Sequence, residues 1–197
     1  MIVKQIGVVM FVPLLAALGG ACGGGSAPTA AVCIKAVEES GQTTDECLPV
    51  ALEGARVDLG TPAFTHPTPI TNPLHPTSLI QQTIYGGQVE GKPFRTEVTL
   101  LPRTTAVSWR GGTVETALVQ YVAYLDGRIH EVALDRFAQA DDGSVWYFGE
   151  DVYNFEDGKV ADTDGTWVAN DRVPPAMIMP TTPRPGNFYR PENAPRS

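Results

Sequence analysis

The chain has 197 residues, of which 43% are hydrophobic and 18% are charged. That length suits one domain with a tail, and it is long enough to bury a hydrophobic core. The 14 basic and 22 acidic residues give a formal net charge of -8 without any cluster of cations, so a nucleic-acid partner is not expected. The 20 glycines and 17 prolines indicate many turns and argue against a long helical bundle.

The first residues have the layout of a secretory signal peptide, predicted over residues 1–21. Lys4 precedes an apolar stretch at 6–18, and small residues follow up to Cys22. A helix of that stretch would reach only about 20 Å, which is short for a hydrocarbon core of roughly 30 Å. The small residues that end in Cys22 resemble a bacterial lipobox, in which the cysteine is acylated. The alternative is ordinary secretion, with Cys22 incidental.

The residues after the lipobox are typical of a flexible tether. Gly23-Gly24-Gly25-Ser26 opens the segment 22–31, and such a composition separates a membrane anchor from a folded domain. We therefore expect an exported lipoprotein that is anchored to a membrane through Cys22 and faces the periplasm or the cell exterior.

Cysteine arithmetic agrees with this expectation. Once Cys22 is assigned to lipid, Cys33 and Cys47 remain as one pair, and a bridge between them would close a 15-residue loop. Such a disulfide would stabilise by about 3 kcal/mol in the chain-entropy model. A metal pair is the alternative, but further Cys or His ligands are missing nearby. Residues 32–60 are thus predicted to form a disulfide-clamped segment, with a short helix over 34–39.

The remaining residues, 61–197, are predicted to form a single β-rich domain. Five prolines in residues 61–76 exclude a helix or a central strand there, and the chain is Pro-rich again after Pro174. Between them, β-branched and aromatic runs alternate with four Asp-Gly pairs, which are strong hairpin signals. The expected fold is mainly β. It is an antiparallel meander of eight or nine strands forming a twisted sheet, half-barrel or sandwich, with Pro-rich extended N- and C-terminal segments.

The Asp126-Gly127 pair predicts a register for the hairpin around it. A two-residue loop there places Leu125 opposite Arg128, Tyr121 opposite Val132 and Val119 opposite Leu134. One apolar face would then carry five residues, namely Val119, Tyr121, Ala123, Val132 and Leu134.

The Asp142-Gly143 pair predicts the next hairpin in the same way. It places Ala140 opposite Val145, Gln139 opposite Trp146, Phe137 opposite Phe148 and Asp135 opposite Glu150. The second face would therefore show Phe137, Trp146 and Phe148 beside two opposed carboxylates. These five residues, Asp135, Phe137, Trp146, Phe148 and Glu150, are the predicted ligand-binding set.

The sequence of this hairpin resembles a family of secreted bacterial proteins and lipoproteins. The likeness rests on the run Ala138-Gln139-Ala140-Asp141-Asp142-Gly143-Ser144-Val145-Trp146-Tyr147-Phe148-Gly149-Glu150, which is similar to the family's Ala-Gln-Asp-x-Asp-Gly-x-Val-Trp-Tyr-Phe-Gly-Glu hairpin. Upstream, Asn72-Pro73-Leu74-His75-Pro76 resembles the opening of those domains. Arg136 stands where the family has an aromatic residue. The family has no assigned activity, so the resemblance implies export and domain boundaries.

The sequence lacks a complete catalytic motif. There is no Gly-x-Ser-x-Gly elbow for a serine nucleophile and no nucleotide-binding glycine loop. Residues 162–165 (Asp-Thr-Asp-Gly) start like a calcium loop without the later bidentate glutamate, so they are interpreted as a turn, with weak Ca²⁺ binding as the alternative. No other cofactor is expected.

Two functions remain open at this stage. The first is a non-enzymatic cell-envelope lipoprotein that binds an apolar, glycan or peptide ligand on the aromatic sheet face. The alternative is an envelope hydrolase, resembling a glycoside hydrolase, that uses Asp135 and Glu150. Opposed positions on neighbouring strands lie about 4.5–5.5 Å apart at Cβ, which suits the carboxyl pair of a retaining glycosidase.

Overall fold

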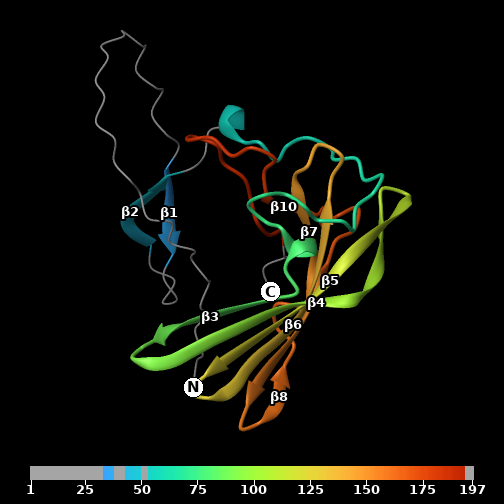
Figure 1. Cartoon of the computed structure of the whole chain (residues 1–197). Coiled ribbons are helices and arrows are strands. Elements are labelled where there is room, and N and C mark those ends of the chain that lie inside the picture. Colours follow the sequence, from blue (N-terminus) through green and yellow to red (C-terminus); the bar gives the residue numbers. More distant parts are fainter. Residues whose placement is uncertain (1–32, 38–42, 50–52, 194–197) are drawn as a thin grey trace, which may run out of the picture.

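The computed structural model describes residues 33–37, 43–49 and 53–193 (Figure 1). The predicted signal peptide, the acylated Cys22 and the tether lie outside these residues. Within the described ranges there is no α-helix, and two short 3-10 helices, η1 (Glu53–Ala55) and η2 (Thr77–Leu79), accompany the strands. The mainly β class predicted from turn and strand patterns is confirmed.

A small two-stranded sheet precedes the domain. Strand β1 (Cys33–Val37) pairs antiparallel with β2 (Thr43–Pro49). The helix predicted over 34–39 is wrong, because residues 34–37 belong to a strand that pairs with β2. In that register Cys33 lies opposite Pro49 and Cys47 lies opposite Lys35. The disulfide between the two cysteines stays a prediction.

The main sheet has eight strands that curl into an open half-barrel (Figure 1). Its order is β10-β7-β6-β5-β4-β3, every pair is antiparallel, and β8 and β9 also pair with β7. The strands are β3 (Gln82–Val89), β4 (Lys92–Trp109), β5 (Gly112–Leu125), β6 (Arg128–Gln139), β7 (Val145–Glu156), β8 (Lys159–Asp162), β9 (Trp167–Val168) and β10 (Ala176–Met179). Strands β4 and β7 are each continuous, whereas the sequence pattern predicts separate strands at 94–101 and 106–109 and at 145–148 and 152–155.

Four two-residue turns join consecutive strands. In each one a non-glycine residue at φ between 50° and 53° precedes a glycine at φ between 70° and 76°, as type I′ turns require. Asp126-Gly127 and Asp157-Gly158 confirm the Asp-Gly prediction, whereas the other two begin with Glu90 and Arg110. Glu and Arg are unusual in this position, because Asn, Asp and Gly tolerate the left-handed conformation best.

The predicted register of β5 and β6 holds only near the turn. Leu125 pairs with Arg128 as predicted, but the register shifts by one residue at His130, so that Tyr121 pairs with Ala133 and Val119 with Asp135. The predicted pairs of Tyr121 with Val132 and of Val119 with Leu134 are therefore wrong. One extra residue in a strand moves every later side chain to the other face. Val132 and Leu134 consequently lie on the face opposite Val119, Tyr121 and Ala123.

The core is centred on aromatic rings from three distant segments. Phe148 is completely buried and meets the rings of Phe64 and Trp109 edge-on, at centroid distances of 5.3 and 6.1 Å. Phe64 belongs to the Pro-rich segment, which forms no regular strand. The backbone N–H groups of Gln139 and Asp141 donate to the carbonyls of Pro67 and Ala63, both at 2.8 Å. The segment is thus fixed by edge hydrogen bonds and by one buried ring.

Asn72 joins the Pro-rich segment to two other parts of the chain. Its side chain is buried, and Nδ2 donates to the carbonyls of Gly143 at 2.9 Å and Pro180 at 3.1 Å. Its Oδ1 accepts from the N–H of Leu74, and its own N–H donates to Oε1 of Gln139. One amide therefore satisfies backbone groups of the β6–β7 loop and of the C-terminal segment.

Candidate functional site

The carboxyl pair predicted from sequence forms on β6 and β7. Asp135 lies directly opposite Glu150, as expected, but Phe137 pairs with Tyr147 instead of Phe148. Likewise Val145 lies opposite Gln139, one residue away from the predicted Ala140. The cause is a longer loop after Gln139 together with a compensating bulge at Gly149, which restores the register at the acids. The register is therefore wrong near the loop and right at the carboxyl pair.

The bulge needs glycine for a steric reason. Gly149 has a φ of +104°, and a Cβ there would lie 2.1 Å from the carbonyl oxygen of Trp167. Strand β9 passes this close because Gly149 and Glu150 pair with Val168 and Trp167. A side chain at residue 149 would push β9 away from the acids.

The Tyr147 hydroxyl links the pair to a row of aromatic rings. It donates to Oδ1 of Asp135 at 2.7 Å. The Tyr147 ring stacks on Phe137 at 4.9 Å between centroids, and it meets Trp167 edge-on at 5.4 Å. His75, from the Pro-rich segment, packs on the outer side of this row at 5.4 Å from the Phe137 ring. We call Asp135, Tyr147 and Glu150 the acid cluster.

The two carboxyls of the acid cluster keep their protons to a higher pH than free carboxyls do. Desolvation, with a further contribution from the Glu131 carboxylate, raises the pKa of Asp135 to about 7, although the Tyr147 hydrogen bond acts in the opposite sense. Desolvation and the neighbouring Asp135 raise the pKa of Glu150 to about 8. Two opposed carboxyls that avoid double ionisation can hold and transfer a proton at neutral pH.

The other two predicted site residues do not join the acid cluster. Trp146 pairs with Ala138 and points to the opposite face, where its Nε1 donates to Oγ of Ser144 at 2.7 Å. Phe148 belongs to the buried aromatic core. The structure thus brings together Asp135, Phe137 and Glu150 of the predicted set. Tyr147 joins them, although the expected register assigns it to the other face.

A hollow of about 340 Å³ lies on the face that carries Trp146. It is lined by residues from 56–62, by Trp109 and Arg110 at the tip of the β4–β5 hairpin, by Trp146, and by residues 174–177 with Arg190 and Asn193. Neither Asp135 nor Glu150 lines it. We call this site the hollow. A second, more open depression shares Trp109, Arg110 and Pro174 and adds Asp171.

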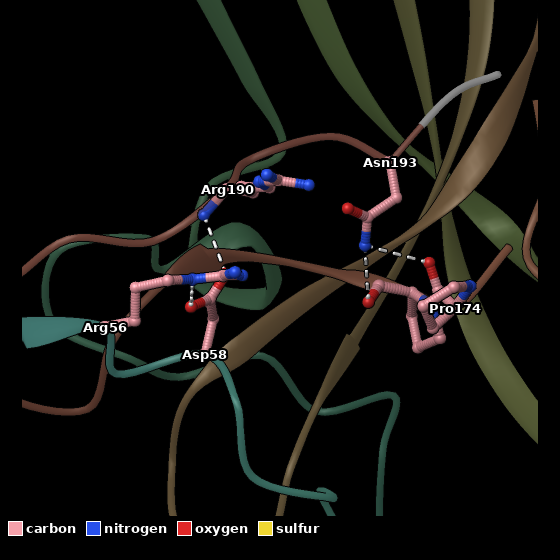
Figure 2. Close-up of polar contacts among 6 residues, drawn as sticks. Arg56, Asp58, Pro174, Arg190 and Asn193 are labelled. Atoms are coloured by element: carbon pink, nitrogen blue, oxygen red, sulfur yellow. Dashed lines mark hydrogen bonds and ion pairs between the residues drawn. The ribbon is translucent and has the colours of Figure 1, made fainter. Parts of the chain in front are cut away.

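Polar contacts fix the walls of the hollow (Figure 2). Arg56 donates from Nε and Nη2 to the two carboxylate oxygens of Asp58 at 2.9 and 2.7 Å, and Asp58 also accepts from the N–H of Arg190 at 2.9 Å. Burial acts against ionisation, but these bonds outweigh it and lower the pKa of Asp58. Nδ2 of Asn193 donates to the carbonyls of Pro174 and Pro175 at 3.1 and 3.3 Å.

Arg110 occupies the turn at the rim of the hollow. Its N–H donates to Oδ1 of Asp171 at 2.6 Å, Nη1 donates to Oγ1 of Thr61 at 3.3 Å, and the guanidinium carbon lies 5.7 Å from the centre of the Trp109 ring. The backbone is held at φ +53°. Arg110 is absent from the predicted site residues, and its only signal in the sequence is an arginine in a turn position that favours Asn, Asp or Gly.

The calcium-loop segment serves as a turn. Oδ1 of Asp162 accepts from Nδ2 of Asn154 at 2.6 Å and from the N–H of Asp164 at 3.0 Å. In the part of the chain that the structure describes, no group of three or more His, Cys, Asp or Glu side chains is arranged to hold a metal ion. Weak Ca²⁺ binding by this turn stays a prediction.

Comparisons with protein-family models, curated proteins and solved structures found no match for this chain. Among the described residues, no helix is both long and apolar enough to cross a membrane.

Proposed function

We propose that the chain is a non-enzymatic lipoprotein of the bacterial cell envelope that binds a glycan, peptide or apolar ligand in the hollow. The observation that carries this proposal is the composition of the hollow. Trp109, Pro174, Pro175 and Met177 offer apolar surface, and a few arginine and asparagine groups converge on it. Ligand sites combine these two features, and 340 Å³ lies within their usual range of volumes.

The envelope location is supported by the sequence. The predicted signal peptide, the lipobox ending in Cys22 and the flexible tether are the features that export and anchor such proteins. If Cys22 is acylated, the full chain made in a bacterial host should partition into detergent and incorporate labelled palmitate, and Cys22→Ser should abolish both. Wild-type protein found unlabelled in the aqueous phase would contradict the anchor.

Ligand binding is tested with soluble peptidoglycan fragments, which carry both glycan and peptide. We expect calorimetric binding by the full chain and a loss of affinity of about tenfold in Trp109→Phe, which keeps a ring against the core but removes indole surface. The matched control is Tyr85→Phe, an exposed aromatic on β3 far along the sheet from the hollow. Unchanged affinity in Trp109→Phe, or no binding by the wild type, would contradict the proposal.

A hydrolase is the second candidate, favoured by the opposed Asp135 and Glu150 with their raised pKa values. A neutral acid beside an ionised one is the requirement for glycoside hydrolysis. Against it, neither acid lines the hollow. Release of reducing ends from peptidoglycan, lost in Glu150→Gln and retained in the exposed control Glu156→Gln, would establish this activity. No release by the wild type would eliminate it.

A further inference from the structure

The hollow is positively charged within an acidic protein. Three arginines, Arg56, Arg110 and Arg190, and one aspartate, Asp58, line it, so its side chains sum to +2 while the whole chain carries -8. Asp58 and Arg56 satisfy each other through a two-pronged contact. The positive charge of the hollow is therefore carried toward a ligand by Arg110 and Arg190.

The two arginines reach the hollow from different segments. Arg110 comes from the β4–β5 turn, whereas Arg190 is fixed through its backbone to Asp58 and extends its side chain toward Asn193 (Figure 2). Arg110 and Arg190 line the same space as Trp109. Guanidinium binds a carboxylate through paired hydrogen bonds, and an indole face packs on an apolar or saccharide ring.

Arginine is not a residue that the turn at position 110 favours. A non-glycine residue at φ +53° is strained, and Asn or Asp would relieve the strain in a type I′ turn. Asp126 and Asp157 show that this chain uses Asp at two equivalent turns. The turn itself therefore does not require an arginine at position 110.

We infer that the hollow takes a saccharide bearing a carboxylate, with the carboxylate bound by Arg110 and Arg190 and the sugar ring packed beside Trp109. This inference rests on the proposed function and names the class of ligand. Three properties of the hollow favour this class of ligand. They are its net positive charge, the indole of Trp109 in its wall, and its volume of about 340 Å³, which suits about one sugar residue.

Two sugars that differ by one charged group give the test. N-acetylmuramic acid carries a lactyl carboxylate on the ring of N-acetylglucosamine, which is otherwise the same and neutral. Calorimetry with the full chain should show at least tenfold tighter binding of the acidic sugar. Arg110→Asn should remove that preference.

Matched variants separate charge from folding. Glu90→Asn introduces the same residue at the equivalent position of the β3–β4 turn. Glu90 does not line the hollow, so this variant should keep the preference for the acidic sugar. Arg190→Gln should weaken it at least threefold. Equal affinity for both sugars, or a preference that survives in Arg110→Asn, would overturn the inference while leaving ligand binding intact. Absence of binding by either sugar would also overturn it, and the peptidoglycan fragments then decide the proposed function separately.

Discussion

The acid cluster and the hollow are built from the same sheet in different ways. The acid cluster gathers residues from one hairpin, at positions that face each other across β6 and β7. The hollow gathers residues 56–62, a hairpin tip, one side chain of β7 and the C-terminal segment, which are far apart in the sequence. The first is closed by internal hydrogen bonds, whereas the second leaves apolar and cationic groups around an open space. The acid cluster can therefore be located from the pairing within one hairpin. The hollow instead depends on segments outside that hairpin, including the Pro-rich ones, that pack together.

The largest expected effect follows from breaking the bulge that sets the acid cluster. Gly149→Val should lower the free energy of unfolding by about 4 kcal/mol or more, because its side chain would collide with the Trp167 carbonyl and strain a positive φ. The matched control is Gly91→Val, also at positive φ but with no heavy atom within 4 Å of its Cβ, which should cost only about 1–2 kcal/mol. Urea denaturation compares them. Equal losses would show that β9 does not pass over residue 149.

The second effect separates the two regions by pH. Asp135 and Glu150 have pKa values raised to about 7 and 8 in the folded state, so the folded chain retains protons that the unfolded chain releases near pH 4. This stability is fully present below about pH 4 and is lost as the pH rises through 7 and 8. Between pH 6.5 and 9 these two carboxyls should lower the free energy of unfolding by about 3 kcal/mol.

The control for the pH effect is a pair of neutral isosteres. The double variant Asp135→Asn/Glu150→Gln keeps the acceptor for the Tyr147 hydroxyl and removes both titrations. Its stability should be nearly flat over the same range and should exceed that of the wild type at pH 9. A wild-type curve that rises with pH would mean that the carboxyls are ionised and compensated in the folded state.

A smaller effect concerns the contact of the Pro-rich segment with the β6–β7 loop and the C-terminal segment. Asn72→Ala leaves the carbonyls of Gly143 and Pro180 without their donor, and it should cost about 2 kcal/mol in unfolding free energy. Asn170→Ala, at an exposed asparagine of the segment after β9, is the control and should cost less than about 1 kcal/mol. Thermal and urea unfolding measure both. Equal costs would show that the Pro-rich segment is held by its prolines and by Phe64 alone.

The same contrast explains what could be predicted from sequence. Strand content, the Asp126-Gly127 turn and the Asp135–Glu150 pairing follow from local alternation and turn chemistry. The bulges at His130 and Gly149 do not, because each depends on how a neighbouring strand or segment packs. The predicted pairing of Asp135 with Glu150 is right because the extra residue of the Gly149 bulge compensates for the longer β6–β7 loop. The hollow was not predictable, because residues 56–62 and 174–193 meet only through tertiary contacts.

The three tryptophans give a direct test of where ligand binds. Trp109 and Trp146 line the hollow, whereas Trp167 packs on Tyr147 in the acid cluster. Each indole N–H gives its own nitrogen-15 NMR signal, and Trp→Phe variants assign the three.

Titration of the labelled full chain with peptidoglycan fragments should therefore shift the signals of Trp109 and Trp146 and leave that of Trp167 in place. A shift confined to Trp167 would place the ligand at the acid cluster and contradict the assignment of binding to the hollow.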